Sequence, residues 1–341
     1  MMFRTVYLFF RYFLGKPVPE TPEFDADRAI ADHALLEARE RARHGDWQAA
    51  RKVIEDAGND WELRGRRVAE LSSLAQKEDG WLYAWLRPAP SDPSAVHMQA
   101  VMLGGRAAVA RGSKTAEHTS AEQFVDFEQL SEAAAQVGRR AMELAPPGDP
   151  LPWVTFMQAF FSDRHGRGIT LDEVFDEGRR RDPYNFDLHF RAVTLRCQKW
   201  GGSHEQMFST AREVAAAAPP GANSVMFPLF AHIEYVLLEI AWDKKLEPSV
   251  RGAKRYFRRA EVRQELDQWI AKWRAGTPNP ANRSTVLQWV AMFYILAGRR
   301  KAAREVFDEL GQYVSPVAAW AYIWGDREYG YLSSWLWANR I

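Results

Sequence analysis

Residues 170–220 read TLDEVFDEGRRRDPYNFDLHFRAVTLRCQKWGGSHEQMFSTAREVAAAAPP, and they predict a repeated alternation of helix and stop. Thr170 and Glu173 form a T-x-x-E capping box, in which each side chain satisfies a free N–H group of the first helical turn. Ser203 and Gln206 repeat this pattern after two glycines. Prolines and glycines close each segment. The stretch therefore predicts three short helices, of which the second and third form an antiparallel pair.

The second of these helices, expected at about 185–199, is apolar on two sides. At 100° per residue its apolar residues fall on two opposite stripes. One stripe contains Phe186, Phe190, Val193 and Cys197, and the other contains Leu188, Ala192 and Leu195. The following helix has a single apolar stripe. We therefore expect an inner helix buried between two layers and an outer helix buried on one side, as in stacked helix-pair repeats.

Prolines recur along the chain at a nearly constant interval. Pro147, Pro183 and Pro220 are 36 and 37 residues apart, and Pro280 and Pro316 are again 36 apart. Periods of about 34–40 residues with helical patterning are typical of helix-pair repeats. Strand signals are scarce. The sequence therefore predicts an all-α fold, an irregular solenoid of antiparallel helix pairs with one long interval between Pro220 and Pro280.

The segment STVLQWVAMFYILAGRRKAAREVFDELGQYVSP resembles a tetratricopeptide repeat. Counted from the turn glycine Gly298, the apolar positions of that family are occupied by Leu287, Val290, Ala291, Tyr294, Ala303 and Phe307, and the closing proline, Pro316, comes one residue late. The segment GDWQAARKVIEDA resembles the second half of such a repeat through Ala50, Ile54 and Ala57. The turn KWGGSHEQM is similar to one in a bacterial helical domain family of unknown function. The resemblance implies a tetratricopeptide-like α-α superhelix that binds peptides in a concave groove.

Composition restricts the classes of partner and compartment. The chain is 47% hydrophobic, which is ample for a large core. Lys and Arg total 45 against 44 for Asp and Glu, and this balance argues against a general nucleic-acid-binding protein. The single cysteine, Cys197, rules out an intramolecular disulfide and suits a reducing compartment. We therefore expect a cytoplasmic protein of bacterial type that does not bind nucleic acid.

The first residues, MMFRTVYLFFRYFLGKP, form a short apolar segment. It is shorter than the ~20 residues that span a bilayer, and Arg4 and Arg11 interrupt it. These arginines are seven positions apart and share one face of a helix, opposite phenylalanine and leucine side chains. Residues 1–14 are therefore either a peripheral membrane anchor or a terminal helix that caps the array. We favour the cap.

These signals divide the chain into five segments. They are an N-terminal apolar helix with its lead (1–24), N-terminal helix pairs (25–111), a mobile loop (112–122), a helix-pair repeat array (123–324) and an aromatic C-terminal cap (325–341). The loop is assigned because it lacks an apolar period. The cap is assigned because large rings bury much area, which a terminal repeat requires. A partner-binding aromatic patch is the alternative.

Motifs that would indicate catalysis or a bound metal are absent. The chain contains no phosphate-binding glycine loop, no G-x-S-x-G and no H-E-x-x-H. Its eight histidines and one cysteine lack zinc-finger spacing. Asp172, Glu173, Asp176 and Glu177 make one half-helix acidic, which we attribute to the helix dipole and to solvation. We therefore expect no catalysis, no cofactor and no metal.

The segment RGAKRYFRRAEVR predicts a helix with a broad cationic face. The basic side chains on that face include Arg251, Lys254, Arg255, Arg258 and Arg259, and the opposite face holds Ala253, Tyr256, Phe257 and Ala260. Such a face can bind an acidic peptide, a phosphate or an anionic lipid. We favour a solvated face.

Together these features predict a non-catalytic scaffold that binds a protein or peptide partner, with an acidic partner as one option. We expect polar residues of the inner helices to line the groove, namely Arg191, Gln198, Lys199 and Gln288. The first alternative is a membrane-surface adaptor that uses residues 1–14 and the basic helix. The second is an enzyme in which helices enclose a pocket with several converging titratable side chains.

Overall fold

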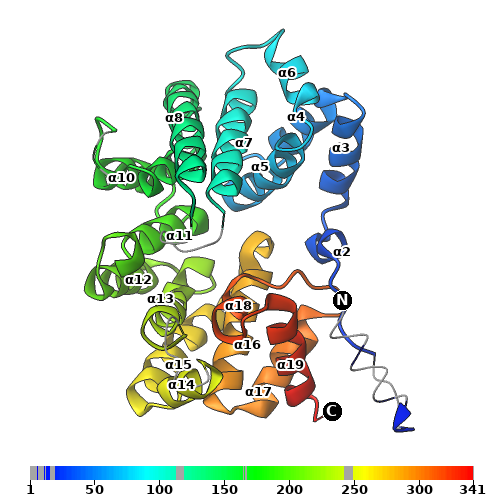
Figure 1. The fold of residues 1–341 in the computed structure, drawn as a ribbon, viewed down its shortest axis with the longest axis vertical. Helices are drawn as coiled ribbons and strands as arrows, with labels where there is room; N and C mark the ends of the chain where they lie inside the picture. Colours follow the sequence, from blue (N-terminus) through cyan, green and yellow to red (C-terminus); the bar gives the residue numbers. More distant parts are fainter. Residues whose placement is uncertain are drawn as a thin grey trace. The chain divides into compact units, whose positions relative to one another are not determined.

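The computed structural model confirms the all-α class. Helices account for 75% of the chain, and the described residues contain no strand. The structure describes residues 6, 11, 13–15, 20–112, 119–163, 165, 167–241 and 249–340. The chain forms two compact units (Figure 1). We call Asp32–Thr210 the middle unit, and we call Met1–Ala31 with Ala211–Ile341 the terminal unit because it joins both ends of the chain.

The middle unit is built from short helices around one long helical hairpin. Its helices are α3 (His33–Arg43), α4 (Trp47–Glu55), α5 (Trp61–Ala75), α6 (Gly80–Leu86), α7 (Pro93–Arg111), α8 (Ala121–Leu144), α9 (Leu151–Phe156), the 3₁₀ helix η2 (Met157–Phe161), α10 (Leu171–Arg181), α11 (Phe186–Leu195), the 3₁₀ helix η3 (Gln198–Trp200) and the first half of α12 (His204–Ala217). The two longest, α7 and α8, lie side by side (Figure 1). Helix α12 continues into the terminal unit.

Side-chain caps explain where many of these helices begin. Asp46, Asp60 and Asp92 each accept a hydrogen bond from a backbone N–H group in the first turn of α4, α5 and α7. Both halves of the predicted Thr170–Glu173 capping box are present at the start of α10. Such caps satisfy N–H groups that have no partner within the helix, typically stabilising it by about 1 kcal/mol each.

Helix α11 is buried on two sides, as its two apolar stripes predict. Its buried residues, with Cys197 just beyond its end, are Phe186, Leu188, Ala192, Val193, Leu195 and Cys197. Leu188 lies in a core cluster with residues of α9, η2 and α10. The Cys197 sulfur lies 3.1 Å from the sulfur of Met207 in α12. Phe190 is only half-buried and stacks on Phe186.

The terminal unit contains the remaining helices. They are α2 (Ala26–Ile30), the 3₁₀ helix η4 (Asn223–Met226), α13 (Phe227–Val236), the π-helix η5 (Leu237–Ala241), α14 (Ser249–Phe257), α15 (Ala260–Arg274), α16 (Pro280–Ala297), α17 (Arg300–Leu310), α18 (Ala319–Trp324) and α19 (Arg327–Ala338). Helices α16 and α17 pack as a hairpin around the turn at Gly298, which adopts the left-handed conformation with φ 81°. Glycine adopts this conformation without steric cost.

A short N-terminal strap, residues 20–25, joins the two ends of the chain. The Glu23 N–H group donates to the carbonyl oxygen of Gln312 at 2.7 Å, and the Val314 N–H group donates to the Glu23 carbonyl at 2.9 Å. These bonds form an isolated parallel bridge. The strap is therefore part of the terminal unit, although Glu23 and Gln312 are 289 positions apart in the sequence.

Aromatic rings fill the space behind the strap. The fully buried Tyr331 ring of α19 lies 6.0 Å from the Phe24 ring, 5.2 Å from Phe307 of α17 and 5.6 Å from Trp320 of α18, each distance joining ring centroids. The three contacts are edge-on, a favourable arrangement for aromatic pairs. Several C-terminal aromatic residues thus pack inside the terminal unit.

A polar network lies within the same unit. The His232 ring nitrogen Nδ1 is 2.6 Å from the Tyr256 hydroxyl, and Nε2 is 3.4 Å from the Glu265 carboxylate. Arg212 donates two hydrogen bonds to Glu265, at 2.6 and 2.9 Å. Burial alone would raise the pKa of Glu265, but the hydrogen bonds from His232 and Arg212 hold it well below its usual range. The network therefore keeps a partly buried carboxylate ionised and paired.

The sequence pattern predicts one continuous helix at about 28–43 and another at about 249–275, and both are divided in the structure. The first is interrupted at Ala31, whose left-handed conformation (φ 53°, ψ 24°) ends α2 before α3 begins. The expected helix at about 249–275 is interrupted because Arg259 has an extended backbone and precedes α15. Apolar periodicity continues across both breaks, so it does not reveal them.

Most of residues 1–14, and residues 113–118 of the predicted mobile loop, lie outside the described residues. Val6, Phe13 and Leu14 are described, and they are 53%, 79% and 58% exposed. These three side chains do not contribute to a buried cap. The division into a middle and a terminal unit also differs from the five segments expected from sequence, because the N-terminal strap is paired with the C-terminal part of the chain.

Candidate functional site

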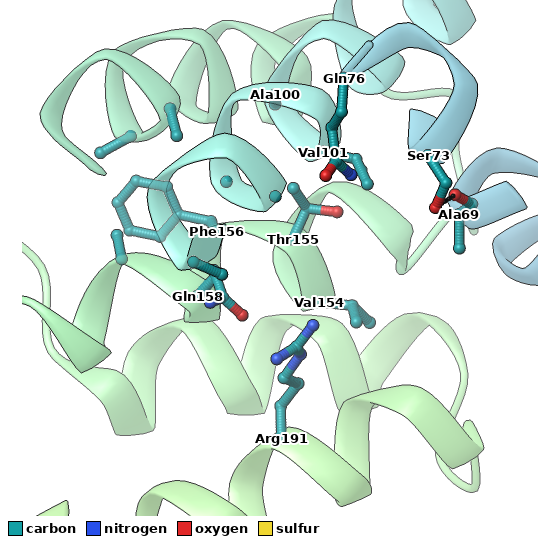
Figure 2. Close-up of a pocket in the computed structure, with 16 residues that line it drawn as sticks. Ala69, Ser73, Gln76, Ala100, Val101, Val154, Thr155, Phe156, Gln158 and Arg191 are labelled. Carbon is teal, nitrogen blue, oxygen red and sulfur yellow. Dashed lines mark hydrogen bonds between the residues drawn. The ribbon is translucent and has the colours of Figure 1, made fainter. Parts of the chain in front are cut away.

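The middle unit contains a cavity of about 330 Å³ that is partly open to solvent (Figure 2). Helices α5, α7, α8, α9 and α11, with η2, form its walls. Ala69, Ser73 and Ala108 are exposed at its rim, whereas Gly104 and Ala135 are buried in its wall. The volume lies at the lower end of the range for small-ligand sites, about 300–1,000 Å³.

The cavity exists because the long hairpin presents small residues to it. The small residues on α7 and α8 that line it are Ala100, Gly104, Gly105, Ala108, Ala134 and Ala135. A side chain at Gly105 would begin 2.2 Å from the amide nitrogen of Gln76. Glycine at this position therefore lets the Gln76 side chain cross the face of α7. Larger residues on these helices would fill the space.

Arg191 supplies the positive charge of the cavity. It extends from α11 into the space (Figure 2), and no hydrogen bond or close ion pair among the described residues uses its guanidinium. Asp187 lies one turn earlier on the same face of the helix. Burial raises the pKa of the Asp187 carboxyl to about 6, although the charge of Arg191 acts in the opposite direction. Burial also lowers the pKa of the Arg191 guanidinium, and Asp187 offsets part of this effect.

Gln158 places an unsatisfied acceptor at the same cavity. Its side-chain oxygen Oε1 is buried and has no hydrogen-bond partner among the described residues. An unpaired buried polar atom costs about 1–3 kcal/mol. The side chain belongs to η2 and lines the cavity opposite Gly104. A ligand that donates a hydrogen bond would remove this cost.

Thr155 is held by a buried histidine. The His97 ring nitrogen Nε2 lies 2.8 Å from the Thr155 hydroxyl oxygen. Burial, assisted by the charge of Arg64, lowers the pKa of His97 to about 3. The imidazole is therefore neutral at physiological pH and too weak a base to activate the hydroxyl efficiently. The pair positions Thr155 at the cavity and does not form an activated nucleophile.

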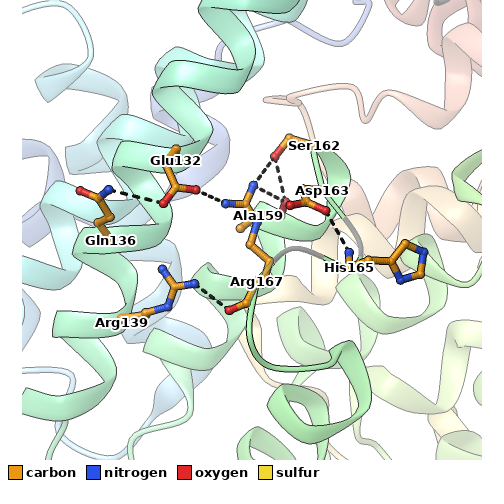
Figure 3. Close-up of polar contacts among 8 residues, drawn as sticks. All are labelled: Glu132, Gln136, Arg139, Ala159, Ser162, Asp163, His165 and Arg167. Carbon is orange, nitrogen blue, oxygen red and sulfur yellow. Dashed lines mark hydrogen bonds and ion pairs between the residues drawn. The ribbon is translucent and has the colours of Figure 1, made fainter.

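A second polar cluster fixes the loop next to the cavity (Figure 3). The buried Arg167 guanidinium forms an ion pair with Glu132 of α8 and donates to the Ser162 hydroxyl at 2.8 Å. It also donates at 3.4 Å to the carbonyl of Ala159, which lines the cavity. Arg139 of α8 donates to the Arg167 carbonyl at 2.7 Å. These bonds hold the end of η2, and with it one cavity wall, against α8.

The four predicted groove residues do not share a described surface. Arg191 lines the cavity, whereas Gln198 and Lys199 lie in η3 and do not line it. Gln288 is in the terminal unit and is 1% exposed. Its amide donates to the Ser315 carbonyl and accepts from the Trp320 indole, so it holds the segment after α17 in place. Gln288 is therefore not available to a peptide.

The predicted basic residues lie on α14 and in the short turn that follows it. Arg251, Arg255, Arg258 and Arg259 are exposed, and Lys254 is half-buried. Their partners on the opposite face, Ala253, Tyr256 and Phe257, are buried, whereas Ala260 is exposed because it begins α15. The guanidinium of Arg259 lies over the Tyr256 ring, 5.1 Å from its centroid. This distance is within the ~6 Å of a cation–π contact.

A metal-binding cluster or a helix that could span a membrane would also indicate function. The described residues contain no group of three or more His, Cys, Asp or Glu side chains that could hold a metal ion. One helical stretch, Asn223–Ala241, is long and apolar enough to cross a membrane, with a mean hydropathy of 1.4. Because 67% of it is buried inside the structure, and core helices meet the same criterion, it is weak support for a membrane span.

The chain matches no protein-family model, no curated protein and no solved structure at a significant level. The cavity in the middle unit is therefore the best-supported candidate site. Of its polar residues, sequence patterning predicted only Arg191. Gln76, Thr155 and Gln158 were missed because they stand on different helices, and periodicity does not tell which helices enclose a common space. The small-residue runs LGGRAA and SEAAAQ were the one available signal.

Proposed function

We propose that the protein is a non-catalytic binding scaffold whose cavity in the middle unit receives an acidic group of a protein or peptide partner. The observation that carries this proposal is the Arg191 guanidinium, which points into an open cavity without a close anionic partner among the described residues. A charged hydrogen bond between arginine and carboxylate is about twice as strong as a neutral one. Walls of alanine and glycine reduce the competing water around such a contact.

The enzyme alternative has less support. The titratable residue that contacts the cavity through a hydrogen bond, His97, is held neutral by burial. Burial raises the pKa of the Asp187 carboxyl to about 6, but Asp187 is not among the residues that line the cavity. A general base and a nucleophile within reach of one another are the minimum for hydrolytic chemistry. The described residues around the cavity do not provide that pair.

The helix-pair interpretation of the fold belongs to the same proposal. Helices α16 and α17 form a hairpin at the position of the tetratricopeptide-like segment. Of its six family positions, Tyr294 is half-buried and the others are buried, namely Leu287, Val290, Ala291, Ala303 and Phe307. Helices α3 and α4 form a second hairpin. Burial at these positions supports a helix-pair origin for both segments. We infer that the units derive from degenerate helix-pair repeats that present a binding cavity.

The experiment selects ligands from a mixture, so the partner need not be identified beforehand. A random peptide library displayed with free C-termini is selected on the wild-type protein and on Arg191→Gln. Arg140→Gln is the charge-matched control, because Arg140 is exposed on α8 and does not line the cavity. Ala108→Trp blocks the rim without altering the core, since Ala108 is exposed.

We expect acidic peptides that bind the wild type and Arg140→Gln equally, and that bind Arg191→Gln and Ala108→Trp about ten-fold or more weakly. All four proteins should have similar melting temperatures. If selection yields no peptide that prefers the wild type over Arg191→Gln, the cavity is not the binding site and the proposal is wrong.

A second candidate, a membrane-surface adaptor, is favoured by one observation. Val6, Phe13 and Leu14 are more than half exposed, whereas a terminal cap would bury them. Phenylalanine and leucine side chains next to arginine are typical of segments that lie in the membrane interface. The exposed arginines of α14 and of the turn after it would add attraction to anionic lipid.

Liposome flotation separates this candidate from the scaffold. The probe is a vesicle of phosphatidylcholine with phosphatidylserine, and the proteins are the wild type, a deletion of residues 1–14, and Arg255→Glu with Arg258→Glu. The adaptor hypothesis predicts that the deletion abolishes flotation and leaves the melting temperature unchanged. A deletion that lowers the melting temperature by several degrees would instead support the cap. Equal flotation of all three proteins would eliminate any role for these segments.

A further inference from the structure

Two complementary groups point into the same cavity of the middle unit. Arg191 is a cation without a close anionic partner, and the Gln158 oxygen Oε1 is a buried acceptor without a donor, both judged among the described residues. Figure 2 shows both side chains turned toward the same space, Arg191 from α11 and Gln158 from η2. The cavity holds only about 330 Å³, so one small ligand would meet both groups.

We infer, on the basis of the proposed function, that the ligand is a monocarboxylate which also carries an N–H or O–H donor. Its carboxylate would bind the Arg191 guanidinium, and its donor would bind Gln158 Oε1. An N-acylated amino acid has this chemistry, whether it is a free molecule or the last residue of a peptide. The ligand class is thus set by two unsatisfied groups in one cavity.

The charge of the site restricts the ligand further. Arg191 is the only cationic side chain among the described residues that line the cavity, and Asp187 lies one helical turn away on α11. A phosphate dianion or a dicarboxylate would bring two negative charges to one guanidinium and a neighbouring carboxylate. Like charges at such distances repel strongly in a partly buried site. A single carboxylate matches the cavity better.

The walls restrict the remainder of the ligand. Ala100, Gly104, Ala135, Val154 and Phe156 present apolar surface, so the group between carboxylate and donor must be small and uncharged. The lining residues Ala69 of α5 and Ala108 of α7 are exposed, so a ligand can continue out of the cavity past them. Both a free N-acyl amino acid and a peptide end satisfy these conditions.

The test uses three small probes that differ by one group. N-acetylglycine has the carboxylate and the N–H donor, levulinate replaces that N–H with a methylene, and N-acetylglycinamide removes the charge. Dissociation constants are measured by NMR titration of the ¹⁵N-labelled full chain. We expect levulinate to bind roughly 3–10-fold more weakly than N-acetylglycine, because one hydrogen bond is lost. We expect N-acetylglycinamide to bind about ten-fold or more weakly.

A variant that lacks the Gln158 acceptor extends this comparison to a thermodynamic cycle of two ligands and two proteins. Gln158→Leu replaces the amide, and with it Oε1, by an apolar side chain of similar size, and it leaves Arg191 in place. N-acetylglycine should then bind this variant only as tightly as levulinate does, and levulinate should bind the variant as it binds the wild type. Because the probe comparison on the wild type needs no mutation, it remains decisive if the variant folds poorly.

Each outcome decides one statement. If N-acetylglycine and levulinate bind equally and both require Arg191, the anion site of the proposed function stands and the donor inference is wrong. If none of the probes binds, or binding survives Arg191→Gln, both the anion site and the donor inference are wrong.

A longer probe, N-acetyl-tetraalanyl-glycine, distinguishes a peptide end from a free small acid. Equal or tighter binding than N-acetylglycine indicates a peptide end. Weaker binding indicates a free small acid, which would keep the carboxylate site but overturn the peptide partner of the proposed function.

Discussion

At the scale of single residues, burial sets the charge of the groups around the cavity. His97 is forced to be neutral, Asp187 ionises only with difficulty, and Arg191 remains cationic with a lowered pKa. Desolvation is the first cause in all three cases, because a buried charge loses its interaction with water. The cavity therefore combines one available cation with neighbours whose charges depend on pH.

Replacing His97 should change the acid stability of the protein. The folded-state pKa of about 3 lies below the unfolded value of 6.5, so only the unfolded state takes up a proton as the pH falls. Stability from this group is fully present above pH 6.5 and is lost by about 3 kcal/mol on reaching pH 4. His97→Gln should remove this loss. Urea unfolding of both proteins from pH 8 to 4 measures it, and identical pH slopes would contradict the burial of a neutral histidine.

Replacing Asp187 should change the stability at high pH instead of at low pH. Its folded-state pKa of about 6 lies above the unfolded value of 3.8, so ionisation destabilises the folded state at higher pH. The cost is absent below pH 3.8, grows as the pH rises to 6 and is complete above it. Asp187→Asn should therefore be more stable than the wild type at pH 8 by up to about 3 kcal/mol. Screening of the carboxylate charge by solvent would reduce this difference. The difference should disappear at pH 3.5, and a constant difference would argue against titration of this carboxyl.

At the scale of elements, α11 shows how a helix can serve both the core and the site. One face enters the core through Leu188, whose Cδ1 atom occupies the space that a side chain at Gly178 of α10 would need, 2.6 Å from the ideal Cβ position. A polar position between the two apolar stripes carries Arg191 into the cavity. Two-sided burial fixes the rotation of the helix and thereby aims the guanidinium.

The two sides of α11 should differ in sensitivity to truncation. Leu188→Ala should destabilise the middle unit by about 2–5 kcal/mol, because it removes a fully buried side chain and leaves a cavity. Phe190→Ala should cost less, since its ring is only half-buried. Chemical denaturation of the two variants makes the comparison. A larger loss for Phe190→Ala would mean that the ring lies in the core.

The N-terminal strap is the element that periodicity could not place. Its pairing with residues near 313 depends on a contact between the two ends of the chain, and local sequence contains no record of such a partner. The proline-containing segment was expected only to lead into the first helix. Instead it contributes the buried Thr21 and the Phe24 ring to the terminal unit.

Removing the Phe24 ring should therefore destabilise the terminal unit. The ring is half-buried and meets Tyr331 edge-on, so Phe24→Ala should cost about 1–3 kcal/mol, less than a fully buried phenylalanine. Deletion of residues 1–14 leaves the strap intact and is the matched control. Thermal unfolding compares the two. A melting temperature that is unaffected by Phe24→Ala would show that the strap does not stabilise this unit.

At the scale of the whole molecule, local rules predicted the helices and long-range packing determined the units. Capping boxes, prolines and apolar stripes predicted α10 and the two-sided α11 because these signals act within a few residues. The breaks at Ala31 and Arg259 were missed because backbone conformation changes there without a change in apolar pattern. The cavity was missed because several helical elements must converge to enclose it, and only tertiary structure brings Arg191 and Gln158 together.

The most direct test of carboxylate binding follows the Arg191 side chain itself. Selective ¹⁵N-arginine labelling gives one side-chain Nε–H resonance per arginine, and Arg191→Lys assigns the one of interest by its disappearance. On titration with N-acetylglycine, we predict a saturable shift of the Arg191 resonance while the exposed Arg140 resonance stays in place. A titration that leaves Arg191 unchanged, or that shifts exposed arginines to the same extent, would contradict the claim that this cavity is a carboxylate-binding site.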